Sequence, residues 1–219
     1  MTPDGKTDGL QIRRMTIGLA GRTLLSMSAT IRPGEILTVM GPSGSGKSAL
    51  LATLGGFLDP AFTATGDILI DGSDLTDIPA EKRGAGMLFQ DALLFPHLSV
   101  GDNLLFGLSS TVRSARERRQ LVEQALVEIE LTGFFDRDPA TLSGGQKARV
   151  ALQRTLLSAP RFLLLDEPFS KLDTDLRHQV RDLVFTRAKA LKLPVVLVTH
   201  DRSDALAAGG ETMTIGAEP

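Results

Sequence analysis

Short apolar runs, bounded by polar or glycine-rich segments, recur along the chain. Residues 162–165 and 195–198 are each four consecutive apolar residues, which is typical of strands buried in a parallel sheet. Residues 10–40 alternate between apolar and polar positions, and residues 66–70 and 85–89 have the length and composition of two more strands. The pattern predicts a sheet whose strands come from both halves of the chain.

Helical periodicity fills the intervals between the predicted strands. Within residues 114–130, apolar side chains fall at positions 121, 122, 125, 126 and 129, the spacing of one helix face. The other predicted helices span residues 47 to about 57, 145–158 and 174–191. Strand and helix alternate near both ends and the middle is helical, so we predict an α/β fold. In this single domain of residues 1–219, the core comprises about 1–90 and 158–219, and a helical subdomain is inserted at about 91–157.

Composition narrows the functional classes. The 219 residues are 42% hydrophobic, enough for one large domain with an inserted lobe. The formal charge of −2 gives no basic field that would attract nucleic acid, so we expect no nucleic-acid partner. The absence of cysteine excludes disulfides and cysteine-based zinc sites. No apolar stretch has the length of a signal peptide or of a membrane span.

A glycine-rich segment joins the last strand of residues 10–40 to the helix that follows. It matches the phosphate-binding pattern GxxxxGK[ST] over eight consecutive residues, Gly41, Pro42, Ser43, Gly44, Ser45, Gly46, Lys47 and Ser48. Its glycines let successive backbone N–H groups face a phosphate, and the helix adds a partial positive charge. Lys47 would reach the terminal phosphates of a nucleotide, and Ser48 would bind Mg²⁺. A plain glycine-rich turn is the alternative, but all eight positions and both flanks agree with the motif.

Two carboxylates, Asp166 and Glu167, directly follow the apolar run 162–165. A buried strand would deliver both to the carboxyl edge of the sheet, where ligands bind in such folds. Asp166 would orient Mg²⁺, and Glu167 would polarise the attacking water. A strand that ends in Asp-Glu is a weak signal by itself, and a solvated strand end would be the better interpretation. Together with the phosphate loop, it predicts a site for nucleotide hydrolysis.

A third motif begins the helix predicted over residues 145–158. It reads Leu142, Ser143, Gly144, Gly145 and Gln146. Ser143 is a good helix cap, and capping alone would explain it. The same hydroxyl, the glycine amides and the helix dipole would also form an anion site. At the far end of the inserted helices it would not reach the nucleotide of its own chain, and it would instead serve a second copy.

In this order, the phosphate loop, LSGGQ and the Asp-Glu strand resemble the ATP-binding cassette (ABC) family over about residues 10–205. The resemblance implies a P-loop NTPase core with an inserted helical subdomain. It also implies that Gln90 contacts Mg²⁺ and senses the terminal phosphate. Asp173 would be the acid of the D-loop, and His200 would contact the terminal phosphate. The other two histidines, His97 and His178, are expected at the surface.

The resemblance thus assigns the site residues and the ligands, which are ATP and Mg²⁺. The expected catalytic residues are Lys47, Glu167 and His200. The expected metal ligands are Ser48, Gln90 and Asp166. The expected nucleotide contacts are residues 41–49, Gln90, residues 143–146 and Asp173. Two chains would hold two ATP molecules head to tail, each between the phosphate loop of one chain and the LSGGQ of the other.

The same resemblance implies membrane partners. Residues 90–106 are rich in Phe and Leu for a loop region, and in the family this region receives the membrane permease. The short chain and its residues 86–108 most resemble bacterial importer ATPases, including thiamine-importer-like ones. We therefore expect a homodimer at the cytoplasmic face of the inner membrane, bound to integral permease subunits and served by a solute-binding protein.

Two rival classes remain at this stage. A non-transport ABC ATPase in DNA repair or translation would have long coiled coils in the insert, or two cassettes in one chain, and this chain has neither. A nucleotide-dependent scaffold without hydrolysis is disfavoured because Glu167 and His200 are both present.

The chain departs from the family at two positions. Ala49 stands where the family commonly has Thr, so a hydroxyl contact to the nucleotide is missing. The aromatic residue that usually stacks on adenine should fall near Gly18 and Leu19, and no aromatic residue occurs before Phe57. We therefore predict weak selection between ATP and GTP.

Overall fold

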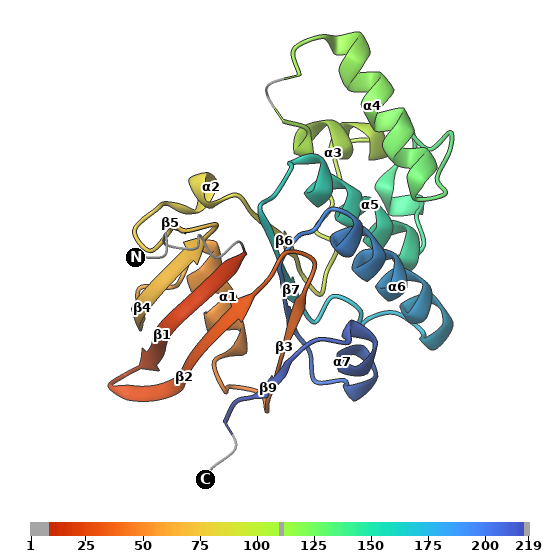
Figure 1. The fold of residues 1–219 in the computed structure, drawn as a ribbon. Coiled ribbons are helices and arrows are strands. Elements are labelled where there is room, and N and C mark those ends of the chain that lie inside the picture. The colour runs from red at the N-terminus through yellow and green to blue at the C-terminus, as the bar shows by residue number, and fades with distance from the viewer. Residues whose placement is uncertain (1–8, 110–111, 217–219) are drawn as a thin grey trace. The chain divides into compact units, whose positions relative to one another are not determined.

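The computed structural model describes residues 9–109 and 112–216 (Figure 1). Their contacts divide them into two compact units. The first is built from the described parts of residues 1–87, 161–167 and 185–219, and the second from those of residues 88–160 and 168–184. The predicted helical insert, 91–157, falls within the second unit, which also takes in residues 168–184.

An antiparallel sheet opens the first unit, with strand order β2-β1-β4-β5. Its strands are β1 (Leu10–Leu19), β2 (Arg22–Ile31), β4 (Phe62–Ile70) and β5 (Ser73–Asp74). Ala20 and Gly21 connect β1 to β2, with φ angles of 50° and 77°. Positive φ at both central residues is the backbone that a tight hairpin turn requires, so this pair sets the register of the two strands.

The second sheet of this unit has the order β6-β7-β8-β3-β9. Its strands are β3 (Ile36–Met40), β6 (Ala85–Leu88), β7 (Phe162–Asp166), β8 (Val195–Val198) and β9 (Thr212–Thr214). β7, β8, β3 and β9 run parallel, with Asp166 opposite Val198 and Val39 also opposite Val198. The carboxyl ends of these strands therefore meet at one edge of the sheet.

Buried apolar side chains hold the first unit together. Every residue of β8 is buried, which explains the uninterrupted apolar run in the sequence. α1 (Lys47–Gly55) contributes Leu50, Leu51 and Leu54, each 0% exposed, to a core that also takes residues from both sheets. Two shorter helices, α2 (Ala80–Arg83) and α7 (Arg202–Ala208), complete this unit.

The second unit is helical. It contains α3 (Val100–Gly107), α4 (Ala115–Glu128), a 3₁₀ turn (Pro139–Thr141), α5 (Gly144–Leu157) and the first part of α6 (Thr174–Ala190). Val122 and Leu126 of α4 pack in one core with Val100, Leu104 and Val150, as the helical spacing predicts. Among the described residues, no helix combines the length and the apolar character that crossing a bilayer requires.

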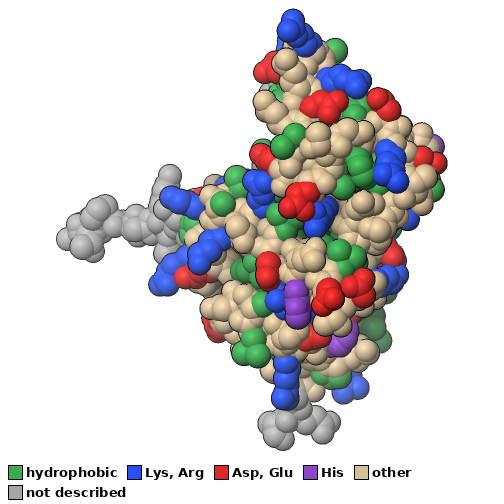
Figure 2. Space-filling model, turned by 90° about the vertical axis from the view of Figure 1, so that its right-hand side faces the viewer, with side chains coloured by type: hydrophobic (Ala, Val, Ile, Leu, Met, Phe, Trp, Pro, Cys, Tyr) green, Lys and Arg blue, Asp and Glu red, His purple; other side chains and the backbone are tan. Residues whose placement is uncertain are grey.

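Charged side chains of both signs are interspersed on the face of the molecule seen in Figure 2. No broad field of Lys and Arg, and none of Asp and Glu, dominates this face. This mixture agrees with the small formal charge of −2.

Candidate active site

The phosphate loop occupies the turn between β3 and α1. Gly44 and Gly46 have φ angles of 79° and 91°, a backbone region that favours glycine. A β carbon at Gly41 would lie 2.4 Å from the carbonyl oxygen of Ile215, and one at Gly46 would lie 3.1 Å from the side chain of Leu25. The glycines of the motif are therefore required by the loop itself, by its neighbours, or by both.

The N-terminus of α1 offers hydrogen-bond donors. Its cap is Gly46, which provides no side-chain hydrogen bond, and its first turn contains no acidic residue. Its first N–H groups thus have no capping side chain, and the helix dipole makes this end partially positive. Beside it, the buried Ser45 hydroxyl has no hydrogen-bond partner among the residues that the structure describes. Open N–H groups, the dipole and an unpaired hydroxyl together fit a phosphate.

Lys47 folds back into the same loop. Its Nζ donates to the carbonyl oxygens of Gly41 and Pro42, both at 2.8 Å, and the residue is 8% exposed. These two bonds hold the ammonium group inside the loop. A phosphate would offer the same group a charge-assisted hydrogen bond, which is stronger than a bond to a neutral carbonyl.

Asp166 lies at the end of β7 and accepts a hydrogen bond from the Ser48 hydroxyl. Burial has the largest effect on the pKa of Asp166 and raises it, and the negative charge of Glu167 also raises it. The bond from Ser48 and the charge of Lys47 act in the opposite direction, and the net pKa lies above the ordinary value. Hydroxyl and carboxylate oxygens are ligands that Mg²⁺ takes, so the pair Ser48 and Asp166 fits that metal.

Glu167 and His200 form the other polar pair of this edge. Glu167 Oε2 lies 3.1 Å from His200 Nδ1, and the two side chains are 27% and 62% exposed. Glu167 has a φ of 46°, a strained angle for a residue with a side chain. Its N–H donates to the carbonyl of Val198 at 2.9 Å, which ties this turn to the end of β8. The carboxylate is therefore held beside the imidazole, at the edge where the phosphate loop begins.

In the second unit, Ser143 caps α5. Its hydroxyl accepts from the N–H of Gln146 at 3.3 Å, while Gln146 Oε1 accepts from the N–H of Ser143 at 3.0 Å. A β carbon at Gly145 would approach a methyl group of Leu176 to 2.3 Å, so this glycine lets α5 and α6 pack closely. Asp173 caps α6 by accepting from the N–H of Leu176 at 3.1 Å. Four of the predicted site residues, Ser143, Gly145, Gln146 and Asp173, thus have structural roles here.

Gln90 lies just after β6 and belongs to the second unit. It lines a pocket of about 160 Å³ together with Gly144 and Leu172. Its neighbour Asp91 pairs with Lys171, with 2.5 Å between Oδ1 and Nζ. The predicted set therefore forms two groups: residues 41–49, Asp166, Glu167 and His200 belong to the first unit, and Gln90, residues 143–146 and Asp173 to the second.

Sequence reasoning missed residues that adjoin the phosphate loop and the β1–β2 hairpin. Phe62 of β4 lies directly opposite Leu19 in the ladder, so both side chains point to the same face of the sheet. This is the face of the core, where Phe62 is partly buried and Leu19 is 36% exposed. At the C-terminal end, Ile215 donates its N–H to the carbonyl of Met40, beside the loop. No local signal links Phe62 with Leu19, because only strand register joins them.

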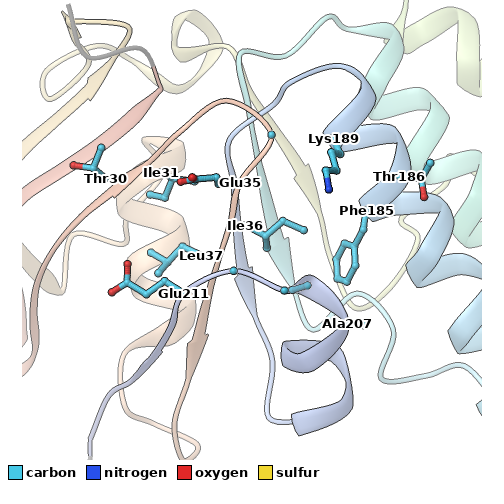
Figure 3. A pocket seen from close by; sticks show the side chains of 14 residues that line it. Thr30, Ile31, Glu35, Ile36, Leu37, Phe185, Thr186, Lys189, Ala207 and Glu211 are labelled. Carbon is cyan, nitrogen blue, oxygen red and sulfur yellow. The ribbon is translucent and has the colours of Figure 1, made fainter. Parts of the chain in front are cut away.

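A separate pocket of about 580 Å³ lies at the opposite edge of the parallel sheet. Figure 3 shows that Ile36 and Leu37, at the start of β3, line it together with Phe185 and Lys189 of α6 and Glu211. Since the phosphate loop follows the other end of β3, this pocket is distinct from the candidate site. It contains none of the residues that the sequence nominates.

Comparison with known proteins identifies the family. The family model for the ABC transporter matches residues 24–170. The chain belongs to the ABC transporter family. It is 49% identical over 183 residues to the uncharacterized ABC transporter ATP-binding protein YnjD of Escherichia coli, covering 84% of each chain.

Two further ABC relatives are named as importers. The chain is 41% identical over 202 residues to a putative 2-aminoethylphosphonate import ATP-binding protein, PhnT, of Salmonella choleraesuis, covering 91% of this chain and 54% of the relative. It is 44% identical over 181 residues to an Fe(3+) ions import ATP-binding protein, FbpC 1, of Rhizobium meliloti, covering 83% and 50%. The chain thus spans about half the length of these two relatives.

Family membership confirms the predicted resemblance and the α/β P-loop fold. It also supports the predicted function, that of a transport-coupled ATPase, over the DNA-repair and translation alternatives. The importer names concern 2-aminoethylphosphonate and Fe(3+). The narrower resemblance to thiamine importers therefore stays a prediction.

Proposed function

We propose that this ABC ATPase binds Mg-ATP as a homodimer and hydrolyses it to drive import of a small solute through a separate membrane permease. One observation carries the hydrolytic part of the proposal. At one sheet edge, the Ser48–Asp166 and Glu167–His200 pairs adjoin a phosphate loop whose helix N-terminus has no side-chain cap. A cation site, a base and an anion site in such proximity suit phosphoryl transfer to water.

Each residue of this edge then has a chemical role. The N–H groups at the start of α1 and Lys47 bind the phosphates, and Lys47 leaves the carbonyls of Gly41 and Pro42 to do so. Ser48 and Asp166 would hold Mg²⁺, which, when bound, would neutralise charge on the phosphate oxygens. Gln90 stays the metal contact that the family resemblance implies. Glu167 accepts a proton from the attacking water, and His200 contacts the terminal phosphate and orients Glu167.

Leu19 and Phe62 are the proposed contacts of the base. Leu25 of β2, one strand of the β1–β2 hairpin, lies against Gly46, and this contact puts the hairpin beside the phosphate loop. A base that leaves the loop along the hairpin would meet Leu19, which is 36% exposed, and the ring of Phe62 opposite it. Neither side chain has a polar group that would distinguish adenine from guanine.

The second unit supplies the proposed dimer contacts. The start of α5 carries no acidic residue in its first turn, and its dipole favours an anion there. Residues 143–146 would bind the terminal phosphate of the ATP held by the other copy, and Asp173 would lie at the same dimer contact. Because Ser143 already caps α5, its hydroxyl would need to share its lone pairs between the helix and the partner's nucleotide.

Exposed apolar residues support docking to a permease. Within and beside residues 90–106, Phe89, Leu93 and Phe106 are 40%, 56% and 69% exposed. Large apolar side chains at the surface commonly mark interaction sites. The permease would hold the ATPase peripherally at the cytoplasmic face of the inner membrane, and a solute-binding protein would deliver the cargo. The relatives' importer names favour import.

Substitution of Lys47 tests the hydrolytic part. We expect Lys47→Ala to reduce phosphate release from ATP at least roughly a hundredfold, since one such contact to transition-state charge is worth this much. Retention of more than about a tenth of the wild-type rate would contradict the assignment. Co-purification from membranes with an integral permease tests the transport part, and stable association with ribosomes or DNA instead would contradict it.

A further inference from the structure

The segment 91–99, here called the docking loop, has no helix or strand, yet its backbone is held firmly. Asn103 of α3 is 0% exposed and turns its amide toward this loop. Its Nδ2 donates to the carbonyls of Phe95, Leu98 and Ser99 at 3.1, 3.3 and 3.0 Å, and its Oδ1 accepts from the N–H of Phe95 at 2.8 Å. One buried side chain thus fixes the second half of the docking loop.

Arg154 of α5 holds the first half. Its Nη1 donates to the carbonyl of Leu93 at 2.9 Å and to Asn103 Oδ1 at 3.4 Å, and its Nη2 donates to the carbonyl of Ala92 at 3.4 Å. The guanidinium also lies 5.2 Å from the centre of the Phe95 ring. A planar fork that makes several such bonds at once transmits orientation better than a single contact.

The same helix carries the LSGGQ segment at its other end. From Ser143 to Arg154, at 1.5 Å per residue, α5 spans roughly 16 Å. α3 and α5 are also in close contact at the Arg154 end, where a β carbon at Gly107 would lie 2.2 Å from the Arg154 carbonyl oxygen. A helix is stiff over this length, so the bonds from Arg154 to the docking loop join a movement of that loop to the Ser143 end of α5.

We propose that Arg154 is a positioning residue that couples the docking loop to the LSGGQ end of α5. This inference rests on the proposed function, because it requires residues 143–146 to respond to nucleotide. Coupling between two sites is reciprocal for binding. Nucleotide must therefore change the docking loop through Arg154, just as a docked permease changes the nucleotide site through it.

This reciprocity permits a test on the chain alone. The sequence contains no cysteine, so Leu93→Cys introduces a single thiol on the docking loop. The test measures the rate at which a maleimide labels this thiol, with and without saturating Mg²⁺ and a non-hydrolysable ATP analogue. We expect the nucleotide to change the rate about fivefold or more, the lower range of typical coupling between sites. Adding Arg154→Met should reduce that response below about twofold, while the affinity for the nucleotide stays unchanged.

Two further variants keep the test specific. Arg149→Met changes another arginine of α5, whose bonds go to the carbonyl of Ile129, to Glu130 and to Gln179 and not to the docking loop. We expect it to leave the nucleotide response intact. Arg154→Lys keeps the charge but loses the two-pronged geometry, so it should show a reduced response even if Arg154→Met fails to fold.

Three outcomes would overturn the inference. The first is a full nucleotide response in both Arg154 variants, and the second is an equal loss in Arg149→Met. The third is a parent protein that binds the analogue by titration while its labelling rate stays constant. A parent protein that binds no nucleotide would overturn the proposed function as well, and the titration distinguishes this failure from the others.

Discussion

Replacing Leu19 with tyrosine should tighten the binding of ATP. Leu19 is the last residue of β1, at the end of the core face, and is 36% exposed, so a ring there would keep part of its surface in solvent. Its cross-strand neighbours are Arg22 on β2 and Phe62 on β4. Gly18 offers no such space, because a β carbon there would lie 2.9 Å from Thr63 Oγ1 and 3.2 Å from the carbonyl oxygen of Arg22. Position 19 is therefore the place for the missing aromatic.

The expected magnitude follows from what Leu19 and Phe62 already supply. Stacking of a base on an aromatic side chain is worth roughly 1–3 kcal/mol. Leu19 already offers apolar area, and Phe62 already offers one ring beside it, so the gain should fall in the lower half of this range. About 1.4 kcal/mol corresponds to a tenfold decrease in Kd.

The assay is a titration of wild type and Leu19→Tyr with ATP and with GTP. In the wild type we expect the two Kd values to lie within about tenfold, because the triphosphate and Mg²⁺ contribute most of the binding and are common to both. Phe62→Leu should weaken both, and Leu19→Tyr should tighten both. Unchanged affinities in both variants would refute the placement of the base beside this hairpin. A wild-type preference for ATP beyond about a hundredfold would mean that another group reads adenine.

Three other predictions concern the catalytic edge and the dimer. Glu167→Gln should bind ATP but hydrolyse it very slowly, and so elute as a dimer with Mg-ATP in size-exclusion chromatography; a monomer that binds ATP tightly would contradict this. Ser143→Arg should still bind ATP but lose hydrolysis, and mixing it with Lys47→Ala should restore nucleotide-driven dimers through one intact composite site; a mixture without dimers would contradict action on the other copy. Burial raises the pKa of Asp166 above 3.8, its ordinary value. The folded state therefore keeps this proton to a higher pH than the unfolded state, and the protein loses stability as pH rises from the unfolded pKa to the higher folded pKa. Asp166→Asn should therefore flatten the fall in melting temperature above about pH 4 while weakening Mg²⁺-dependent ATP binding; an unchanged pH slope would contradict this.

The sequence by itself determined the features that depend on consecutive residues. The phosphate loop could be predicted because eight neighbouring residues must together adopt one tight backbone conformation. The cap of α5, Ser143, could be predicted because a cap bonds within its own first turn. The strands 162–165 and 195–198 are legible because a parallel sheet covered on both faces demands an uninterrupted apolar run.

The tertiary structure determined the bounds of strands that have no apolar or alternating pattern in the sequence. β4 begins at Phe62 and not at residue 66, because residues 62–65 pair with the end of β1 although most of them are exposed and lack an apolar pattern. β9 exists because residues 212–214 pair with β3, in a segment too short and too polar to predict by itself. Pairing with a neighbour, not intrinsic preference, creates both.

The tertiary structure also decided which distant residues share a function. Phe62 meets Leu19 through the register of β1 and β4, and Glu167 meets His200 because β7 and β8 end side by side. Arg154 reaches the carbonyl of Leu93, 61 positions away along the chain. Such contacts depend on which strands pair and which helices pack. No local sequence pattern encodes them, because the residues around each partner do not indicate which distant residue will lie beside it.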